Sequence, residues 1–126
     1  GRNVPLAFNR KEAKTHGEGG AMIGAPLAGR VLIIDDVITA GTAVREAISL
    51  IRGQGAEPAG VLIALDRQER GQGERSAVEE VRAEFGLPVI AIAGLDELLQ
   101  LTAEDFELIQ HRAGLLDYRN RHGIAA

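Results

Sequence analysis

The sequence predicts an α/β fold, and two patterns along the chain carry this prediction. Three short apolar runs, at 31–34, 60–65 and 89–93, have the length and branched side chains of strands buried on both faces. The segments between these runs place apolar residues at helical spacing. Strands that alternate with helices favour parallel pairing with right-handed crossovers. We therefore expect a Rossmann-like parallel sheet flanked by helices.

The elements of the first half follow from where each apolar pattern begins and ends. Val4–Phe8 is expected to be a short first strand and Arg30–Asp35 the second. A helix is expected over Thr42–Gln54, because its apolar residues recur every three to four positions and a glycine follows its end. Gly60–Leu65 is then the third strand.

The second half continues the alternation. The next helix begins at Ser76, which forms a capping-box pattern with Glu79, and it stops before Gly86. Val89–Ala93 is expected to be the fourth strand. A short helix over Asp96–Leu101 and a longer last helix follow. The longer helix is capped by Thr102 and bears Phe106, Ile109, Ala113 and Leu116.

Composition limits the classes of function. The 126 residues, without a visible linker, suit a single domain over 1–126. The net charge of −4 argues against a general nucleic-acid binder, which would usually be basic. No stretch approaches the roughly 20 apolar residues of a membrane span. The absence of cysteine excludes disulfides and thiolate metal sites, and it agrees with a cytoplasmic location.

The segment from Val31 to Thr42 is the most informative part of the chain. A buried strand ends in Asp35 and Asp36, and a loop of small residues leads into a helix. Such a loop binds anions through its backbone N–H groups and the helix dipole. The two acids would repel a phosphate, so they should face hydroxyl groups, a metal or a cationic transition state. A loop that binds a phosphate and also presents carboxylates suggests that the ligand is a phosphorylated sugar. The alternative is an ordinary turn with solvated acids.

A cationic segment precedes this loop. Arg10, Lys11, Lys14 and His16 bring up to four positive groups into seven positions, and three glycines follow. A cationic loop whose glycines allow the backbone to move suits a mobile lid over a polyanion. The alternative is a solvated charged loop.

A candidate ligand-binding residue follows the third strand. Arg67 lies in Asp-Arg-Gln-Glu-Arg-Gly, at the strand end where ligands bind in open α/β sheets. Its guanidinium can hold a carboxylate bidentately. The alternative is a surface arginine paired with Asp66 or Glu69, which we expect for Arg70 but not for Arg67.

These motifs carry a family resemblance. The segment around the acid pair resembles the phosphoribosyl pyrophosphate (PRPP) loop of type I phosphoribosyltransferases, which implies a partial core of that fold. The resemblance implies that the acids meet the ribose hydroxyls and that the small-residue turn holds the 5′-phosphate. The implied PRPP-binding residues of this loop are Asp35, Asp36, Val37, Ile38, Thr39, Ala40, Gly41, Thr42 and Ala43.

The cationic segment from Arg10 to His16, here called the lid, resembles the catalytic loop of bacterial orotate phosphoribosyltransferases. It therefore narrows the family resemblance to these enzymes. It implies that Arg10, Lys11, Lys14 and His16 bind the diphosphate of PRPP, with Lys14 and His16 catalytic beside Asp35 and Asp36. Arg67 and Thr39 would contact orotate. The family also has a segment before the lid that is missing here, so the chain is expected to be incomplete at its N-terminal side.

The reaction that the resemblance implies is PRPP plus orotate giving orotidine monophosphate and pyrophosphate. It implies Mg²⁺ bound mainly through PRPP and pyrophosphate oxygens, with no metal ligand from the protein. It further implies a homodimer in which the lid reaches the partner's site, and no nucleic-acid or membrane partner. Two alternatives remain, a phosphoribosyltransferase for another base and a non-catalytic PRPP-binding regulator or inactive fragment.

Overall fold

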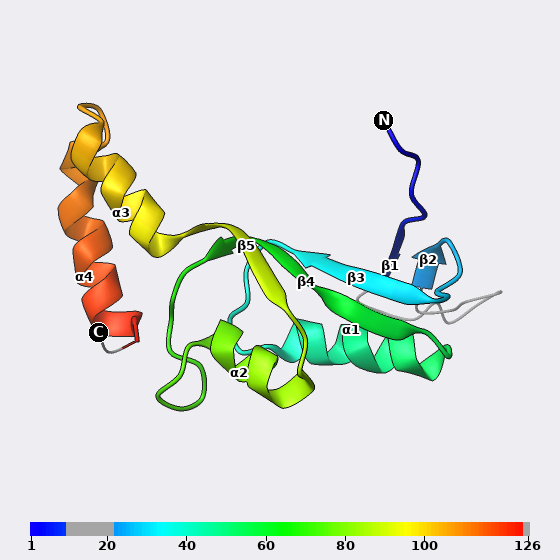
Figure 1. The fold of residues 1–126 in the computed structure, drawn as a ribbon. Coiled ribbons are helices and arrows are strands. Elements are labelled where there is room, and N and C mark those ends of the chain that lie inside the picture. Colours follow the sequence, from blue (N-terminus) through cyan, green and yellow to red (C-terminus); the bar gives the residue numbers. More distant parts are fainter. Residues whose placement is uncertain (10–21, 125–126) are drawn as a thin grey trace, which may run out of the picture.

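The computed structural model describes residues 1–9 and 22–124, and it confirms the α/β fold (Figure 1). Its main sheet is parallel, with the order β3-β4-β5, built from β3 (Arg30–Asp35), β4 (Glu57–Asp66) and β5 (Val89–Gly94). A separate antiparallel pair joins β1 (Ala7–Asn9) and β2 (Met22–Gly24). The three strands of the parallel sheet therefore appear in the expected order, with β3 at its expected bounds and β4 longer at both ends than the expected Gly60–Leu65.

Two helices cover one face of the parallel sheet. Helix α1 (Thr42–Gly53) connects β3 to β4, and α2 (Ala77–Phe85) connects β4 to β5. Since both crossovers step in the same direction, right-handed connections put both helices on the same face, as Figure 1 shows. The core lies between these helices and the sheet. It includes Val44, Ile48 and Ile51 of α1, Val61 and Ile63 of β4, and Val78 and Val81 of α2.

The opposite face of the sheet is apolar and exposed. Leu32, Ile34, Ile90 and Ile92 are 51–77% exposed, while their neighbours Ile33 and Val89 are buried. The expectation that these strands are buried on both faces is therefore wrong for the described residues. The reason is topological, because an order of β3-β4-β5 sends both crossover helices to one side.

The first strand starts later than expected. We predicted a strand over Val4–Phe8, whereas β1 covers Ala7–Asn9 and pairs residue by residue with β2, from Ala7 opposite Gly24 to Asn9 opposite Met22. Strand bounds depend on the partner strand, and β2 was not predicted because its three residues are too short to show a period.

The C-terminal helices differ most from prediction. Helix α3 (Leu95–Glu104) runs through Thr102, which does not cap a new helix. The Thr102 hydroxyl is buried and donates to the Leu99 carbonyl at 2.9 Å. A short 3-10 turn, η1 (Ile109–His111), then leads into α4 (Arg112–His122).

Asp105 breaks the long helix that we expected. Its Oδ1 accepts hydrogen bonds from the backbone N–H groups of Glu107 and Leu108, at 2.9 and 3.1 Å. Such side-chain bonds compete with the helical ladder. Phe106 is consequently 93% exposed rather than part of a buried helical stripe.

The start of α2 is as predicted. The Ser76 hydroxyl accepts from the Glu79 N–H at 3.1 Å, and the Glu79 carboxylate accepts from the Ser76 N–H at 2.9 Å. Ser76 is only 4% exposed, so water cannot easily replace its hydroxyl.

Replacing Ser76 with Ala should lower the free energy of unfolding by about 0.5–2 kcal/mol, because one N–H of the first turn of α2 loses its partner. Urea denaturation measures the change. Ser49→Ala is the matched control, since Ser49 is exposed in the middle of α1 and Ala favours helix. Equal midpoints for Ser76→Ala and the wild type would show that the cap contributes nothing.

Candidate functional site

The loop between β3 and α1 forms a cavity at the C-terminal edge of the parallel sheet. Its volume is about 260 Å³. The residues that line it are Asp35, Val37, Ile38, Thr39, Ala40, Gly41, Thr42, Ala43 and Val44. The structure thus brings together all but one of the loop residues predicted to bind PRPP. The exception is Asp36, which lies at the edge of this loop.

Two of the lining residues, Ile38 and Val44, belong to the hydrophobic core. Ile38 is only 6% exposed. Its side chain anchors the loop, so mainly its backbone is available to a ligand. Thr39 and Thr42 are exposed, which leaves both hydroxyls free to donate.

The N-terminus of α1 is open toward this cavity. No side chain caps it, and its first turn contains no acidic residue. By contrast, α2 begins with a capping box and two acids, and the first turn of α3 also holds two acids. Because the first N–H groups of a helix have no intrahelical partner, an uncapped start without acids suits an anion.

Gly41 makes the sharp entry into α1. Its φ is 76°, in the left-handed region that other residues rarely adopt. A Cβ at this position would also lie 3.0 Å from Arg45 Nη1 and 3.2 Å from Val81 Cγ2. The loop therefore requires glycine here for both conformation and space.

The acid pair turns the chain out of β3. Asp35 Oδ1 accepts from the Asp36 N–H at 2.9 Å, and Asp36 Oδ1 accepts from the Val37 N–H at 2.7 Å. The Asp36 carbonyl accepts from the N–H groups of Ala64 and Leu65 of β4, at 2.9 and 3.1 Å. The two carboxylates are thus fixed beside the end of β4.

The pKa of Asp36 is held below its usual value. The hydrogen bond from the Val37 N–H is the main cause, interaction with the Asp35 side chain adds to it, and the positive charge of Arg67 acts in the same direction. Asp36 is therefore ionised at neutral pH, and Arg67 is close enough to act on its charge.

Arg67 follows the last residue of β4, at the same sheet edge as the loop. Its Nε lies 3.2 Å from Glu69 Oε1, although this ion pair lacks hydrogen-bond geometry and leaves both atoms buried without another partner among the described residues. The pairing with Glu69 that we rejected for Arg67 is therefore present. It uses Nε, and no hydrogen bond between described residues uses the terminal Nη atoms.

The backbone next to Arg67 is held in an uncommon conformation. Gln68 has a φ of 52°, and its N–H donates to Asp66 Oδ1 at 2.9 Å. Its side-chain amide donates to Asp96 Oδ2 at 3.0 Å. A non-glycine residue in this region costs free energy and is common at ligand sites. These bonds fix the direction in which the chain leaves β4.

Arg70 does not pair with Asp66 or Glu69 as expected. Its Nη2 donates to the Arg121 carbonyl at 2.7 Å, its N–H donates to the His122 carbonyl at 2.9 Å, and Ile124 N–H donates to the Gln68 carbonyl at 3.0 Å. The end of α4 is therefore bound to the loop after β4. Sequence gave no signal for this contact, because the partners lie about fifty residues apart and use backbone atoms.

Arg45 and Glu84 are two further residues near the loop that sequence analysis did not single out. Arg45 of α1 pairs with Glu84 of α2 at 2.7 Å and also reaches the loop carbonyl of Ala40 at 2.6 Å. A separation of 39 positions left no local pattern by which to find the pair.

Four predicted site residues, Arg10, Lys11, Lys14 and His16, lie outside the described residues. Within residues 1–9 and 22–124, His, Cys, Asp and Glu side chains nowhere gather in a group of three or more that could hold a metal ion. None of the helices in the described part of the chain combines the length and apolar character needed to cross a membrane.

Comparison with known proteins finds orotate phosphoribosyltransferases among the relatives of this chain. Orotate phosphoribosyltransferases from Laribacter hongkongensis and Chromobacterium violaceum are 64% and 63% identical over 124 residues, which is 98% of this chain. The chain spans 58% of the length of these relatives. A crystal structure of orotate phosphoribosyltransferase from Francisella tularensis matches with a TM-score of 0.72 and 32% identity, covering 95% of this chain and 56% of that one.

The family assignment follows from the match to a domain family. Residues 3–88, well over half of the chain, match the phosphoribosyl transferase domain. That stretch contains the acid pair, the loop cavity and Arg67. This chain therefore belongs to the phosphoribosyl transferase domain family.

Proposed function

We propose that the protein to which this chain belongs transfers the phosphoribosyl group of PRPP to orotate, giving orotidine monophosphate and pyrophosphate. The observation that carries the proposal is the uncapped start of α1 facing a cavity whose edge holds two carboxylates and, on the next strand, Arg67. Relatives 64% and 63% identical to this chain are named orotate phosphoribosyltransferase, and in our proposal the reaction belongs to pyrimidine biosynthesis. We further propose that residues 1–126 act as one domain.

The proposed reaction assigns a task to each part of the site. The N–H groups of the loop and the hydroxyls of Thr39 and Thr42 hold the 5′-phosphate. As pyrophosphate leaves, positive charge develops on the ribose, and Asp35 and Asp36 stabilise it at close range. The terminal amino groups of Arg67 receive the orotate carboxylate, with Thr39 nearby.

Mg²⁺ fits this donor set when the substrate supplies most of the oxygens. Among the described residues no third His, Cys, Asp or Glu gathers with the two adjacent carboxylates, so the coordination of the ion would be left mainly to phosphate oxygens and water. In our proposal the ion is held mainly by PRPP and pyrophosphate, where it would neutralise charge on the leaving group.

The lid and the dimer extend the proposal beyond the described residues. Arg10, Lys11, Lys14 and His16 would neutralise the diphosphate, and in a homodimer they would serve the partner's site. A solved orotate phosphoribosyltransferase from Mycobacterium tuberculosis is described in complex with PRPP, at a TM-score of 0.61 and 29% identity, with 78% of this chain and 52% of that one covered. A cytoplasmic location remains a prediction from composition.

A base-specificity assay on the full-length enzyme tests the proposed function. With PRPP and Mg²⁺, orotate should be converted to its nucleotide, while uracil and hypoxanthine should not. Conversion of a purine or of uracil instead would establish a phosphoribosyltransferase for another base. PRPP binding without turnover of any base would establish a non-catalytic PRPP-binding protein.

Replacing Arg67 with Ala should weaken orotate binding and leave PRPP binding nearly unchanged, because Arg67 lies on a different strand end from the phosphate loop. Loss of a hydrogen bond to a charged group costs about 1.5–3 kcal/mol, which is roughly a 10- to 100-fold rise in the dissociation constant. Calorimetric titration with orotate and with PRPP separates the two effects.

Two variants control this experiment. Arg75→Ala removes an exposed arginine from the same loop and should change neither affinity. Arg67→Lys keeps the charge near Glu69 but loses the planar fork, so it should still bind orotate poorly. Weakened PRPP binding with intact orotate binding would show that our assignment of Arg67 to the orotate subsite is wrong.

A further inference from the structure

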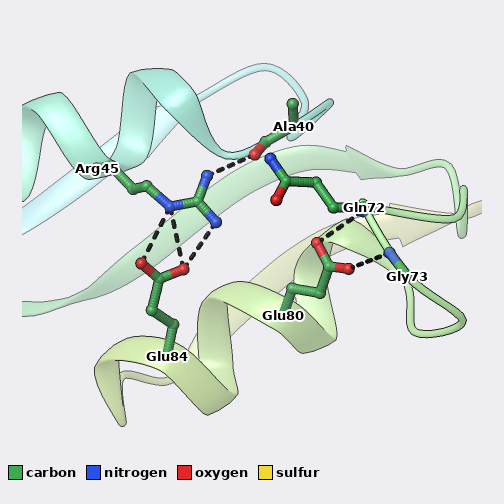
Figure 2. Close-up of polar contacts among 6 residues, drawn as sticks. All are labelled: Ala40, Arg45, Gln72, Gly73, Glu80 and Glu84. Carbon is green, nitrogen blue, oxygen red and sulfur yellow. Dashed lines mark hydrogen bonds and ion pairs between the residues drawn. The ribbon is translucent and has the colours of Figure 1, made fainter.

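Arg45 of α1 connects helix α2 to the loop between β3 and α1. Arg45 Nε donates to both carboxylate oxygens of Glu84, at 3.1 and 3.0 Å, and Nη2 donates to Glu84 Oε2 at 2.7 Å. On its other side, Arg45 Nη1 donates to the Ala40 carbonyl at 2.6 Å. Figure 2 shows the guanidinium between the Glu84 carboxylate and the Ala40 oxygen.

Arg45 is a positioning residue rather than a ligand of the phosphate. It does not line the loop cavity. A cation in the first turns of a helix is also unfavourable to the helix dipole, so its charge needs compensation there. Glu84 supplies this compensation: its own pKa is lowered by the hydrogen bond from Arg45, and the pKa of Arg45 is raised by Glu84.

The bond to Ala40 fixes the orientation of one peptide group. In a trans peptide, the C=O and N–H bonds point in opposite directions. With the Ala40 carbonyl held by Arg45, the Gly41 N–H must point away from Arg45, and it has no hydrogen-bond acceptor among the described residues. Gly41 lines the cavity, so this N–H is available to an anion there.

The peptide needs such a lock because glycine allows it to rotate. Gly41 sits at φ 76°, and glycine populates positive and negative φ with similar ease. A rotated Ala40–Gly41 peptide would present a carbonyl oxygen to the phosphate instead of an N–H donor. The pair is 30% and 44% exposed, and pairs this exposed contribute little to stability. Its effect should therefore fall on the loop rather than on folding.

Helix α2 also binds the loop that follows β4, through the carboxylate of Glu80. Glu80 lies one turn before Glu84 and accepts from the N–H groups of Gln72 and Gly73, at 3.1 and 2.9 Å, as Figure 2 also shows. A Cβ at Gly71 would overlap the Glu80 carboxylate, so this loop closes tightly on α2. Glu80 acts on Arg45 only through its charge and makes no hydrogen bond to it, so it provides an internal comparison for the hydrogen bonds of Glu84.

We propose that Arg45 and Glu84 form a positioning pair that keeps the Gly41 N–H turned toward the 5′-phosphate of PRPP. The proposal rests on the proposed function for the identity of the ligand. It assigns Glu84 an effect only through Arg45, and it places that effect in the binding of the phosphate. The phosphate does not react, so its contact should act on KM for PRPP more than on kcat.

The test uses the full-length enzyme with Arg45→Ala, Glu84→Gln and the double variant. Steady-state kinetics give kcat and KM for PRPP and for orotate, and calorimetry with ribose 5-phosphate gives binding without reaction. Arg45→Ala should raise KM for PRPP and the dissociation constant for ribose 5-phosphate about tenfold, as for one lost bond to a charged group. KM for orotate, kcat and Tm should change little.

Glu84→Gln should have a smaller effect in the same direction, and it should add nothing in the Arg45→Ala background, because Glu84 acts through Arg45. Glu80→Gln should leave KM for PRPP unchanged. Arg52→Ala and Glu46→Gln remove exposed charges from α1 and should match the wild type. An additive double variant would overturn the assignment of Glu84.

The outcomes separate this proposal from the proposed function. An active wild type whose KM for PRPP is unaffected by Arg45→Ala would overturn the positioning pair alone. A fall in Tm together with weaker binding of both substrates would show a general structural role and also overturn it. A wild type that does not convert orotate would overturn the proposed function, while ribose 5-phosphate binding would still test Arg45. A wild type that neither converts orotate nor binds ribose 5-phosphate would overturn both.

Discussion

Replacing Asp36 with Asn in the full-length enzyme is expected to lower kcat by about 10²-fold, equivalent to about 2.7 kcal/mol of transition-state stabilisation, with little change in PRPP binding. The substitution is well matched to the structure. An Asn oxygen can still accept the bond from the Val37 N–H that fixes the turn, so the main change is loss of the negative charge. Stopped-flow or steady-state turnover together with PRPP calorimetry measures the two effects.

The ionisation state of Asp36 sharpens this prediction. Because the Val37 N–H, the Asp35 side chain and the charge of Arg67 lower the pKa of Asp36, its carboxylate stays charged in more acidic solution than an ordinary aspartate does. Protonation of Asp36 therefore cannot explain a loss of kcat at mildly acidic pH. Asp117→Asn is the control, since Asp117 lies on α4 in an exposed pair with Arg121. Unchanged turnover in Asp36→Asn would remove Asp36 from the mechanism.

The parts of the fold that sequence predicted are those fixed by local pattern. The bounds of β3 and the capping box of α2 depend on residues within one turn or one strand, and both were found. The bounds of β1 and the break at Asp105 depend on a partner strand and on a side-chain bond that competes with the helix. Apolar runs also do not reveal on which face of the sheet the helices pack, which is why burial on both faces was expected.

The candidate site also has a part that the sequence predicted and a part that it did not. The acid pair and the small-residue loop form one continuous segment, so the sequence identified most residues that line the cavity. What orients these residues comes from distant positions. Glu84 acts on the loop through Arg45, the end of α4 is bound to the loop after β4, and Arg67 pairs with Glu69 through Nε alone. Such contacts depend on tertiary packing and on the direction of side chains, which no periodicity encodes.

Mixing two inactive variants should restore activity if the lid serves the partner's site. Lys14→Ala would disable the lid, and Asp36→Asn would disable the acid pair. In a mixed dimer with a shared lid, one site receives both defects and the other receives neither. After complete exchange of equal amounts, about half of the dimers are mixed, so roughly a quarter of the wild-type activity should return. Orotate turnover before and after exchange is the measurement.

The opposite arrangement gives a different result. If Lys14 serves its own subunit, each site of a mixed dimer keeps one defect and activity does not return. Subunit exchange must be verified by mass spectrometry of differently tagged subunits, and each variant mixed with itself is the control for slow reactivation. The sequence motivates the shared arrangement, because Arg10 to His16 hold up to four positive groups and three glycines follow within four residues, which permits a long reach. Verified mixed dimers without activity would exclude a shared site, yet they would leave Lys14 as a candidate ligand of the diphosphate within its own subunit.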